Sequence, residues 1–218
     1  MNTSALNNGS SNPLDFNFNF DFVAPQPTQD TELLKQLSFV PGLKEILALR
    51  QVHALEHATV WILSEAQNSR LPRGVANNFQ VDNEHLGGLS TEQGFYLYGE
   101  VNISNLRRAV TVALQRLTSG EWDLAVHPRC GTNMSVSMLL TAGLAVGMHV
   151  VLPRGLFEQL FGLGLAVTTA AELAPDIGAL AQRYVTTSIP FNLVIDSITM
   201  TRDVWGREAH FVKVRWRE

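Results

Sequence analysis

The sequence has little charge and a single cysteine. Of its 218 residues, 17% are charged and 45% are hydrophobic, and the formal net charge is −4. The 16 basic residues are scattered and slightly outnumbered by 20 acidic ones, so no overall positive field favours a nucleic-acid partner. The lone cysteine, Cys130, cannot form an internal disulfide. We therefore expect it to be a free thiol or a metal ligand in a reducing compartment.

The N-terminal segment, residues 1–30, is rich in Asn, Ser and Pro. Between Phe16 and Phe22, Phe alternates with Asn and Asp, a pattern that also fits a strand. No basic or aliphatic residues accompany the alternation. We therefore expect a disordered tail, whose aromatic side chains are available to a partner.

Residues 31–133 are expected to form a mainly helical metal-binding domain with a strand-rich insert. Apolar residues cover most of the circumference of a helix predicted over Leu43–Ala66, so we expect this helix to be well buried. A second, amphipathic helix is predicted to begin at a Ser104 N-cap. Short strands are predicted near Phe79–Val81 and Phe95–Val101.

Two long apolar runs follow over residues 134–173. Met134–Leu152 carries no charge, and Leu156–Leu173 carries only Glu158 and Glu172 near its ends. At a rise of about 1.5 Å per residue, each run reaches close to the hydrocarbon thickness of a bilayer, about 30 Å. We therefore expect a transmembrane helical hairpin, and the alternative is a buried hairpin of a soluble protein.

If the hairpin spans a membrane, charge predicts its orientation, and its small residues suit helix packing in lipid. All Lys and Arg residues except Arg154 lie outside the hairpin. The positive-inside rule then places both termini and the folded domain on the cytoplasmic side of a plasma or thylakoid membrane. Gly143 and Gly147, one turn apart, are expected to permit close helix packing in lipid. The expected partners are membrane lipid, together with a membrane protein or a second copy of the chain.

Residues 174–218 are predicted to begin with a short helix over Asp176–Tyr184, after Pro175. Two runs with alternating apolar and polar residues, Phe191–Arg202 and Ala209–Arg217, predict a β-hairpin that packs on the folded domain. The predicted fold class is therefore α+β, with a helical metal-binding domain, inserted short strands, a transmembrane helical hairpin and a C-terminal β-hairpin.

His53-Ala-Leu-Glu56-His57 is the sharpest local motif. On a helix, His53 and His57 lie one turn apart on one face, so both imidazoles can reach one metal ion, and Glu56 stands beside them. This is the His-x-x-Glu-His arrangement of inverted zinc peptidases. Those enzymes take a further acidic ligand from a later helix, but the predicted helix after Ser104 contains no Asp or Glu. The likeness to peptidases is therefore limited to the motif, and a polar helix face is the alternative.

His127-Pro-Arg129-Cys130-Gly-Thr132 is the second motif, immediately before the first apolar run. Its imidazole and thiolate suit zinc or a similar divalent metal. Together the two motifs predict metal ligands at His53, His57, His127 and Cys130. A thiolate nucleophile at Cys130, paired with His127, is an alternative without metal.

These two motifs resemble a bacterial family of predicted metal-dependent membrane proteins, which has related His-x-x-Glu-His and His-Pro-Arg-Cys-Gly-Thr blocks. The segments Gly87-Gly-Leu-Ser-Thr91 and Gly94-Phe-Tyr-Leu-Tyr-Gly99 resemble more closely a domain of unknown function found in cyanobacteria. The resemblance covers roughly residues 43–190. It implies a metal site and a membrane, but no particular reaction.

Two functions fit these residues. In the first, the chain is a zinc-dependent, membrane-associated hydrolase in which Glu56 acts as general base on a metal-bound water and Arg129 stabilises an oxyanion. In the second, His53, His57, His127 and Cys130 fill a closed zinc site that stabilises a membrane assembly or interaction factor. The number of protein ligands distinguishes them, because a catalytic site keeps one position open.

Overall fold

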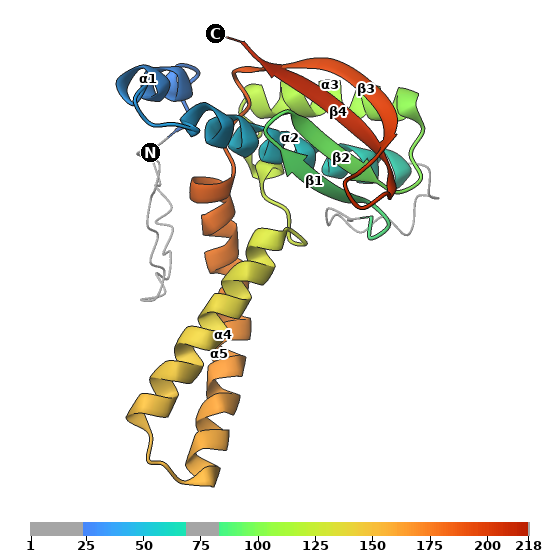
Figure 1. Ribbon diagram of the computed structural model, residues 1–218. Helices are drawn as coiled ribbons and strands as arrows, with labels where there is room; N and C mark the ends of the chain where they lie inside the picture. The colour runs from blue at the N-terminus through green and yellow to red at the C-terminus, as the bar shows by residue number, and fades with distance from the viewer. Residues whose placement is uncertain (1–23, 69–82, 218) are drawn as a thin grey trace, which may run out of the picture.

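The computed structural model describes residues 24–68 and 83–217, which form an α+β body, as predicted, and a long helical hairpin (Figure 1). Most of the predicted tail and the strand predicted near Phe79–Val81 lie outside the described residues. The body contains α1 (Gln29–Gln36), α2 (Leu43–Asn68), β1 (Gly87–Thr91), β2 (Gly94–Tyr98), α3 (Ile103–Thr118), the short 3₁₀ helix η2 (Trp122–Ala125), β3 (Leu193–Arg202) and β4 (Glu208–Trp216). The hairpin contains α4 (Gly131–Val151) and α5 (Leu156–Ala181), and a π-helical turn, η3 (Gln182–Thr186), continues α5.

The four strands form one antiparallel sheet in the order β1-β2-β4-β3. The predicted C-terminal hairpin is thus confirmed as β3 and β4, and it joins the inserted strands through pairing of β2 with β4. The strand over Gly87–Thr91 was not predicted, because its glycines have low strand propensity. It lies at an edge of the sheet.

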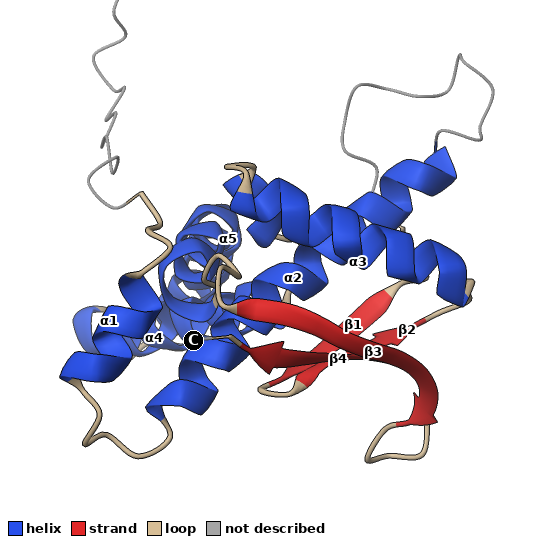
Figure 2. Cartoon of the chain, turned by 90° about the horizontal axis from the view of Figure 1, so that it is seen from above, coloured by secondary structure: helices blue, strands red, loops and turns tan. Residues whose placement is uncertain are grey.

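The main core lies between the sheet and the helices α2 and α3, which cover one face of the sheet (Figure 2). The long helix predicted from Leu43 is confirmed, and Val52, Leu55 and Ala58 on it are fully buried. Buried strand side chains, such as Phe95 and Val212, meet this helix layer. The core therefore holds α2 rigidly beneath the sheet.

The N-cap of α3 differs from the prediction. Asn102, not Ser104, is the N-cap, and its side-chain oxygen accepts a hydrogen bond from the Ser104 backbone N–H at 2.8 Å. Asn102 has the extended backbone that an N-cap requires, whereas Ser104 is already inside the helix. The predicted amphipathic pattern is correct, since one face of α3 is buried.

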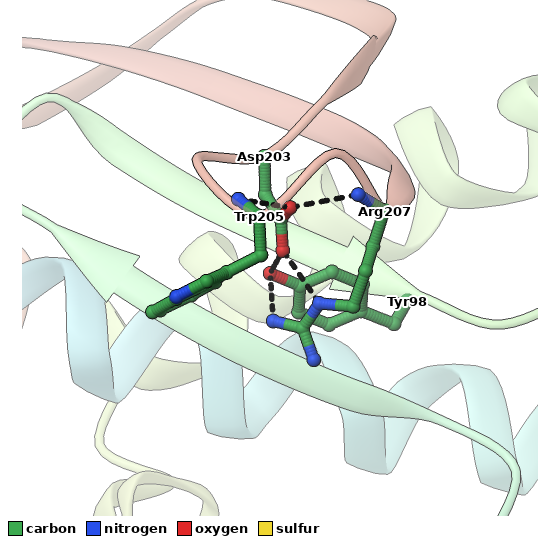
Figure 3. Close-up of polar contacts among 4 residues, drawn as sticks. All are labelled: Tyr98, Asp203, Trp205 and Arg207. Carbon is green, nitrogen blue, oxygen red and sulfur yellow. Dashed lines mark hydrogen bonds and ion pairs between the residues drawn. The ribbon is translucent and has the colours of Figure 1, made fainter.

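The turn between β3 and β4 is organised by Asp203 (Figure 3). Its carboxylate accepts hydrogen bonds from the Tyr98 hydroxyl at 2.8 Å and from the Trp205 backbone N–H at 2.9 Å. The backbone N–H and the Nε of Arg207 also donate to it, at 2.9 and 2.7 Å. Burial acts to raise the pKa of Asp203, but these hydrogen bonds lower it to about 2. The ionised carboxylate therefore fixes this turn.

Helices α4 and α5 pack against each other and project away from the body (Figure 1). The contact uses small residues at every fourth position of α5, which are buried: Gly162, Ala166, Ala170, Ala174 and Gly178. A Cβ atom at Gly162 would overlap Leu152 of α4, so the two backbones approach closely there. Gly143 and Gly147 take no part in this contact, because a Cβ atom at either position would meet no atom of α5 within 4 Å, so their predicted role in helix packing in lipid stays a prediction.

Helix α5 does not break at Pro175. It continues to Ala181, so the separate helix predicted over Asp176–Tyr184 is the end of α5 and its π-helical turn. Proline removes one backbone hydrogen bond. The neighbouring residues Ala174 and Gly178 are nevertheless buried in the hairpin, and this packing maintains the helix across the missing bond.

Both helices of the hairpin are long and apolar enough to cross a membrane. No residue of α4 is buried, and large apolar side chains such as Leu139 and Val150 are 74% and 76% exposed. On α5, Phe157 and Phe161 are 83% and 72% exposed. Apolar surface of this extent, on a hairpin that leaves the body, needs a covering that the described part of the chain does not supply.

Candidate metal centre

Helix α2 presents the His-x-x-Glu-His motif toward the rest of the body. His53 and His57 lie one turn apart, with ring centroids separated by 4.4 Å. His57 is buried and His53 is partly buried. The buried flanks of α2 fix the direction in which both rings point, so the helical spacing places two imidazoles side by side.

Cys130 joins these imidazoles from a distant part of the chain. It is the N-cap of α4, and its Sγ lies 3.3 Å from His53 Nε2. One ligand atom each from His53, His57 and Cys130 lie within 4.8 Å of one another, so the three residues can bind one metal ion. Tetrahedral zinc with two nitrogen ligands and one sulfur ligand would bring these atoms about 3.5 Å apart. The donor set therefore fits the metal after small side-chain adjustments.

Each imidazole is oriented by a backbone carbonyl. His53 Nδ1 lies 3.0 Å from the Thr186 carbonyl oxygen, and His57 Nδ1 lies 2.7 Å from that of Ala125. A carbonyl oxygen only accepts hydrogen bonds, so each Nδ1 carries a proton, and in the neutral form of each ring the lone pair is on Nε2. Metal-binding histidines are typically fixed in this way. Both rings are thus prepared as Nε2 ligands.

The Cys130 thiol is electrostatically adapted to be a ligand. Burial raises the pKa of this thiol, but the neighbouring imidazole of His57 and the Thr132 backbone N–H lower it more, so the pKa lies below its ordinary value. The Thr132 N–H points at Sγ from the first turn of α4, at 3.4 Å. A thiolate is the form that binds metal.

Glu56 is buried beside the ligands and beneath β1. Its carboxylate accepts a hydrogen bond from the Ser90 hydroxyl at 2.6 Å. Gly88 lies directly over it, because a Cβ atom there would overlap the Glu56 carboxylate. Desolvation raises the pKa of Glu56, although the Ser90 hydrogen bond and the charge of His53 partly oppose the rise. Strand β1 therefore covers and orients this carboxyl group.

His127 lies next to the three-residue group and outside it. Its ring contacts Trp61, with centroids 4.6 Å apart, and the centroid of His57 is 5.7 Å away. His127 Nδ1 accepts a hydrogen bond from the Arg129 backbone N–H at 3.3 Å. The structure thus brings together three of the four predicted ligands, and the ligand role of His127 stays a prediction.

The Arg129 guanidinium contacts the segment before β1. It donates to the backbone carbonyls of Asn83 at 2.7 Å and of Glu84 and Leu86 at 3.3 Å. These bonds position the entry to β1 over Glu56. Arg129 also lines the cavity at the metal centre. Its contact with an oxyanion stays a prediction.

The candidate metal centre opens into a cavity of about 640 Å³. His53, Glu56, His57 and Cys130 all line it, together with the residues of β1 from Gly87 to Ser90. A volume of this size suits a small substrate or a short peptide segment. A metal bound at the three ligands would therefore be accessible to substrate.

Sequence reasoning missed the residues that support the centre. Ser90 and Gly88 belong to the Gly-Gly-Leu-Ser segment, which carries a family resemblance but predicted no role for either residue. A glycine inside a strand often marks a position that another group approaches closely, so Gly88 carried a detectable signal. The carbonyl groups of Ala125 and Thr186 have no sequence signal, because any residue supplies a carbonyl.

A family model for a domain of unknown function, DUF6391, matches residues 48–198, which include every residue of the candidate metal centre. An uncharacterized protein of the cyanobacterium Picosynechococcus sp. is 50% identical over 198 residues, which cover 91% of this chain and 94% of that protein. No solved structure matches the chain. The resemblance to a cyanobacterial domain of unknown function is thus confirmed. The resemblance to metal-dependent membrane proteins stays a prediction.

Proposed function

The chain belongs to the DUF6391 family of domains of unknown function, and from the geometry of its metal centre we propose that it is a zinc-dependent hydrolase at a membrane surface. The observation that supports this most strongly is the carbonyl-oriented pair His53 and His57 beside Cys130, with the buried carboxyl group of Glu56 in the same cavity. This arrangement contains both ligands and a base.

The donor set favours zinc and a catalytic site. Two imidazoles and one thiolate suit zinc, and three protein ligands leave one position open. When bound, the metal would supply Lewis acidity, which polarises a carbonyl group and lowers the pKa of a water molecule. The remaining chemistry depends on side chains of this chain.

Glu56 is proposed as the general base. Its raised pKa brings it closer to neutral pH, where a base works efficiently. In the reaction, Glu56 accepts a proton from water as the water oxygen bonds to the carbonyl carbon of the substrate. The bond from that carbon to the leaving oxygen or nitrogen then breaks, and Glu56 returns the proton to the leaving group. The Ser90 hydroxyl holds the carboxylate in position for both transfers.

The hairpin supports a position of this chemistry at a bilayer surface. Helix α4 begins one residue after Cys130, and Thr186, which orients His53, ends the turn that continues α5. If α4 and α5 cross a membrane, the metal centre lies at its surface. Helix α4 has no buried residue, and this exposure supports membrane insertion over a buried hairpin. The basic residues outside the hairpin support a cytoplasmic position for the body, at a plasma or thylakoid membrane.

Metal analysis of the detergent-purified chain tests the site. We expect about one zinc ion per chain in the wild type, given a single three-ligand site. His57→Ala and Cys130→Ser should lose the ion, whereas His85→Ala, at an exposed position outside the cavity, should retain it. Retention in all three variants would contradict the proposal.

A turnover measurement tests the role of Glu56. Fluorogenic ester and peptide substrates are suitable probes, because the bond type is not fixed by the site. Glu56→Gln keeps the shape of the side chain and removes the base, so it should retain zinc and lose hydrolysis. Equal turnover in the wild type and in this variant would eliminate Glu56 as the base.

A structural role for the metal is the second candidate. It is favoured by the position of the ligands, which connect α2 to the start of the hairpin through Cys130 and to its end through the His53–Thr186 contact. In this case His127 would complete a four-ligand site. X-ray absorption of the zinc-loaded chain distinguishes the candidates, because an oxygen ligand in the first coordination sphere supports the hydrolase and a fourth protein ligand supports the structural role.

A further inference from the structure

The free edge of β1 runs along the metal-centre cavity. Strand β1 is an edge strand that pairs with β2, and its residues from Gly87 to Ser90 line the cavity. Among the described residues, no other strand pairs with its outer edge. An edge of this kind offers backbone N–H and C=O groups to an added strand.

The register shows which backbone groups face outward. Thr91 pairs with Gly94 across a two-residue turn, so these two residues form a hydrogen-bonded pair. Such pairs alternate along an antiparallel ladder. Leu89 therefore also bonds to β2, whereas the backbone groups of Gly88 and Ser90 point to the outer edge.

Gly88 and Ser90 are also the residues that contact Glu56 from one face of β1. The outward backbone groups thus lie next to the proposed base. An extended chain that paired with this edge would run alongside β1, and its own backbone carbonyl groups would pass close to Glu56. Because strand pairing uses only backbone hydrogen bonds, it would position peptide groups near Glu56 whatever their side chains are.

Another part of the cavity lining is apolar and exposed. Ile46 and Leu49 of α2 and Val185 of η3 line the cavity, yet they are 55%, 40% and 66% exposed. Large apolar side chains continue from Val185 through Tyr184 of η3, which is 39% exposed, to Leu180 and Ile177 on one side of α5, which are 48% and 37% exposed. Because the end of α5 meets the body here (Figure 1), an apolar surface connects the hairpin to the cavity.

On the premise of the proposed hydrolase, we propose that the substrate is an extended, apolar polypeptide segment at the membrane surface, which adds as a strand to the outer edge of β1. Its backbone pairs with Gly88 and Ser90, and its apolar side chains contact Leu49 and Val185. The bond that breaks is a backbone amide: water supplies the hydroxyl of the new carboxyl group and the proton of the new amine.

Binding of metal-directed hydroxamates to the zinc-loaded chain tests this without turnover. Calorimetry would compare acetohydroxamate, an apolar tripeptide hydroxamate, the same tripeptide with methylated backbone nitrogens, and octanohydroxamate. We expect the tripeptide to bind at least about tenfold more tightly than its methylated form, the change expected when about two backbone hydrogen bonds are lost. Val185→Gln should weaken the tripeptide and leave acetohydroxamate unchanged. Val204→Gln, an exposed change at the β3–β4 turn, should affect neither.

Two substitutions at Ser90 separate the effect of losing the outward backbone N–H from the effect of losing the hydrogen bond to Glu56. Both Ser90→Pro and Ser90→Ala remove the hydroxyl, but only Ser90→Pro also removes the outward N–H, which an edge strand tolerates. We expect Ser90→Pro to bind the tripeptide several-fold more weakly than Ser90→Ala, with equal binding of acetohydroxamate.

The outcomes distinguish this proposal from the proposed hydrolase. If acetohydroxamate does not bind the wild type in a zinc-dependent manner, the metal centre itself fails. If acetohydroxamate binds but methylation of the tripeptide does not weaken its binding, the proposed strand pairing is wrong and the proposed metal centre is retained. Tighter binding of octanohydroxamate than of the tripeptide, with sensitivity to Val185→Gln, would replace the peptide by an acyl amphiphile.

Discussion

Gly88→Ala should disable Glu56 while leaving the metal ligands intact. The Cβ atom introduced at Gly88 would overlap the Glu56 carboxylate and would lie 2.6 Å from its Cγ, well inside van der Waals contact. The carboxylate must therefore move, and it then loses the Ser90 hydrogen bond. A hydrogen bond to a charged group contributes about 1.5–3 kcal/mol, which corresponds to about 10- to 100-fold in an equilibrium between positioned and displaced carboxylate. Hydrolysis should fall by at least that factor.

The neighbouring glycine supplies a matched control. A Cβ atom at Gly87 would meet only Tyr98 Cδ2 within 4 Å, at 4.0 Å, which is ordinary contact. Gly87→Ala changes the same strand in the same chemical way, so it should keep turnover near the wild-type value.

The assay compares initial rates of hydrolysis of a fluorogenic peptide and the zinc content of each variant. Both variants should retain zinc, because both leave His53, His57 and Cys130 unchanged. Wild-type turnover in Gly88→Ala would refute the positioning of Glu56 by β1. An equal loss in Gly87→Ala would show that the strand, rather than the carboxylate, was disturbed.

Three further outcomes are expected from other parts of the molecule. Gly162→Leu should lower the thermal midpoint of the detergent-solubilised chain, because overpacking costs about 1–3 kcal/mol; Gly164→Leu, at an open position, should not, and equal midpoints would contradict the close contact of α4 and α5. The pKa of Asp203 is about 2 in the folded state and about 3.9 in an unfolded chain, so its contribution to stability is present above about pH 4 and is lost as the pH falls toward 2. Denaturant unfolding of Asp203→Asn should lack this acid-dependent loss and that of Asp196→Asn should retain it; the reverse pattern would contradict the role of the turn. Chelation of zinc should lower the melting temperature of the wild type and not of Cys130→Ser, since a ligand that binds the folded state stabilises it; an equal shift in both would place the metal elsewhere.

The elements that the sequence predicted well are those with strong local periodicity. The long helix from Leu43, the apolar hairpin and the C-terminal strands each carry a repeating apolar pattern over many residues. The wrong predictions concern single residues whose effect depends on their neighbours. Pro175 would break an isolated helix, but packing of α5 on α4 maintains it. Gly143 and Gly147 have the spacing of a helix contact, yet the contact between α4 and α5 uses Gly162 and Gly178, so the role of the first pair in lipid stays a prediction.

In the candidate site too, the local features were predictable from the sequence and the long-range contacts were not. Positions 53, 56 and 57 are neighbours on any helix, so the sequence alone placed two imidazoles and a carboxylate together. Their electrostatics depended on burial, because desolvation raises the pKa of Glu56 only when β1 covers it. No local sequence pattern predicts that β1 lies over Glu56.

The sequence by itself determined that His53, Glu56 and His57 lie together on one helix and that the hairpin is long and apolar enough for a membrane, because both properties follow from residue type and helical spacing. Only the tertiary structure decided that Cys130 meets His53, since these residues are 77 positions apart. It also decided that His127 lies against Trp61 and that Gly88 and Ser90 cover Glu56. Contacts over such separations depend on how the whole core packs, and the packing of β1, α2 and the start of α4 is what brings ligands, base and cavity together.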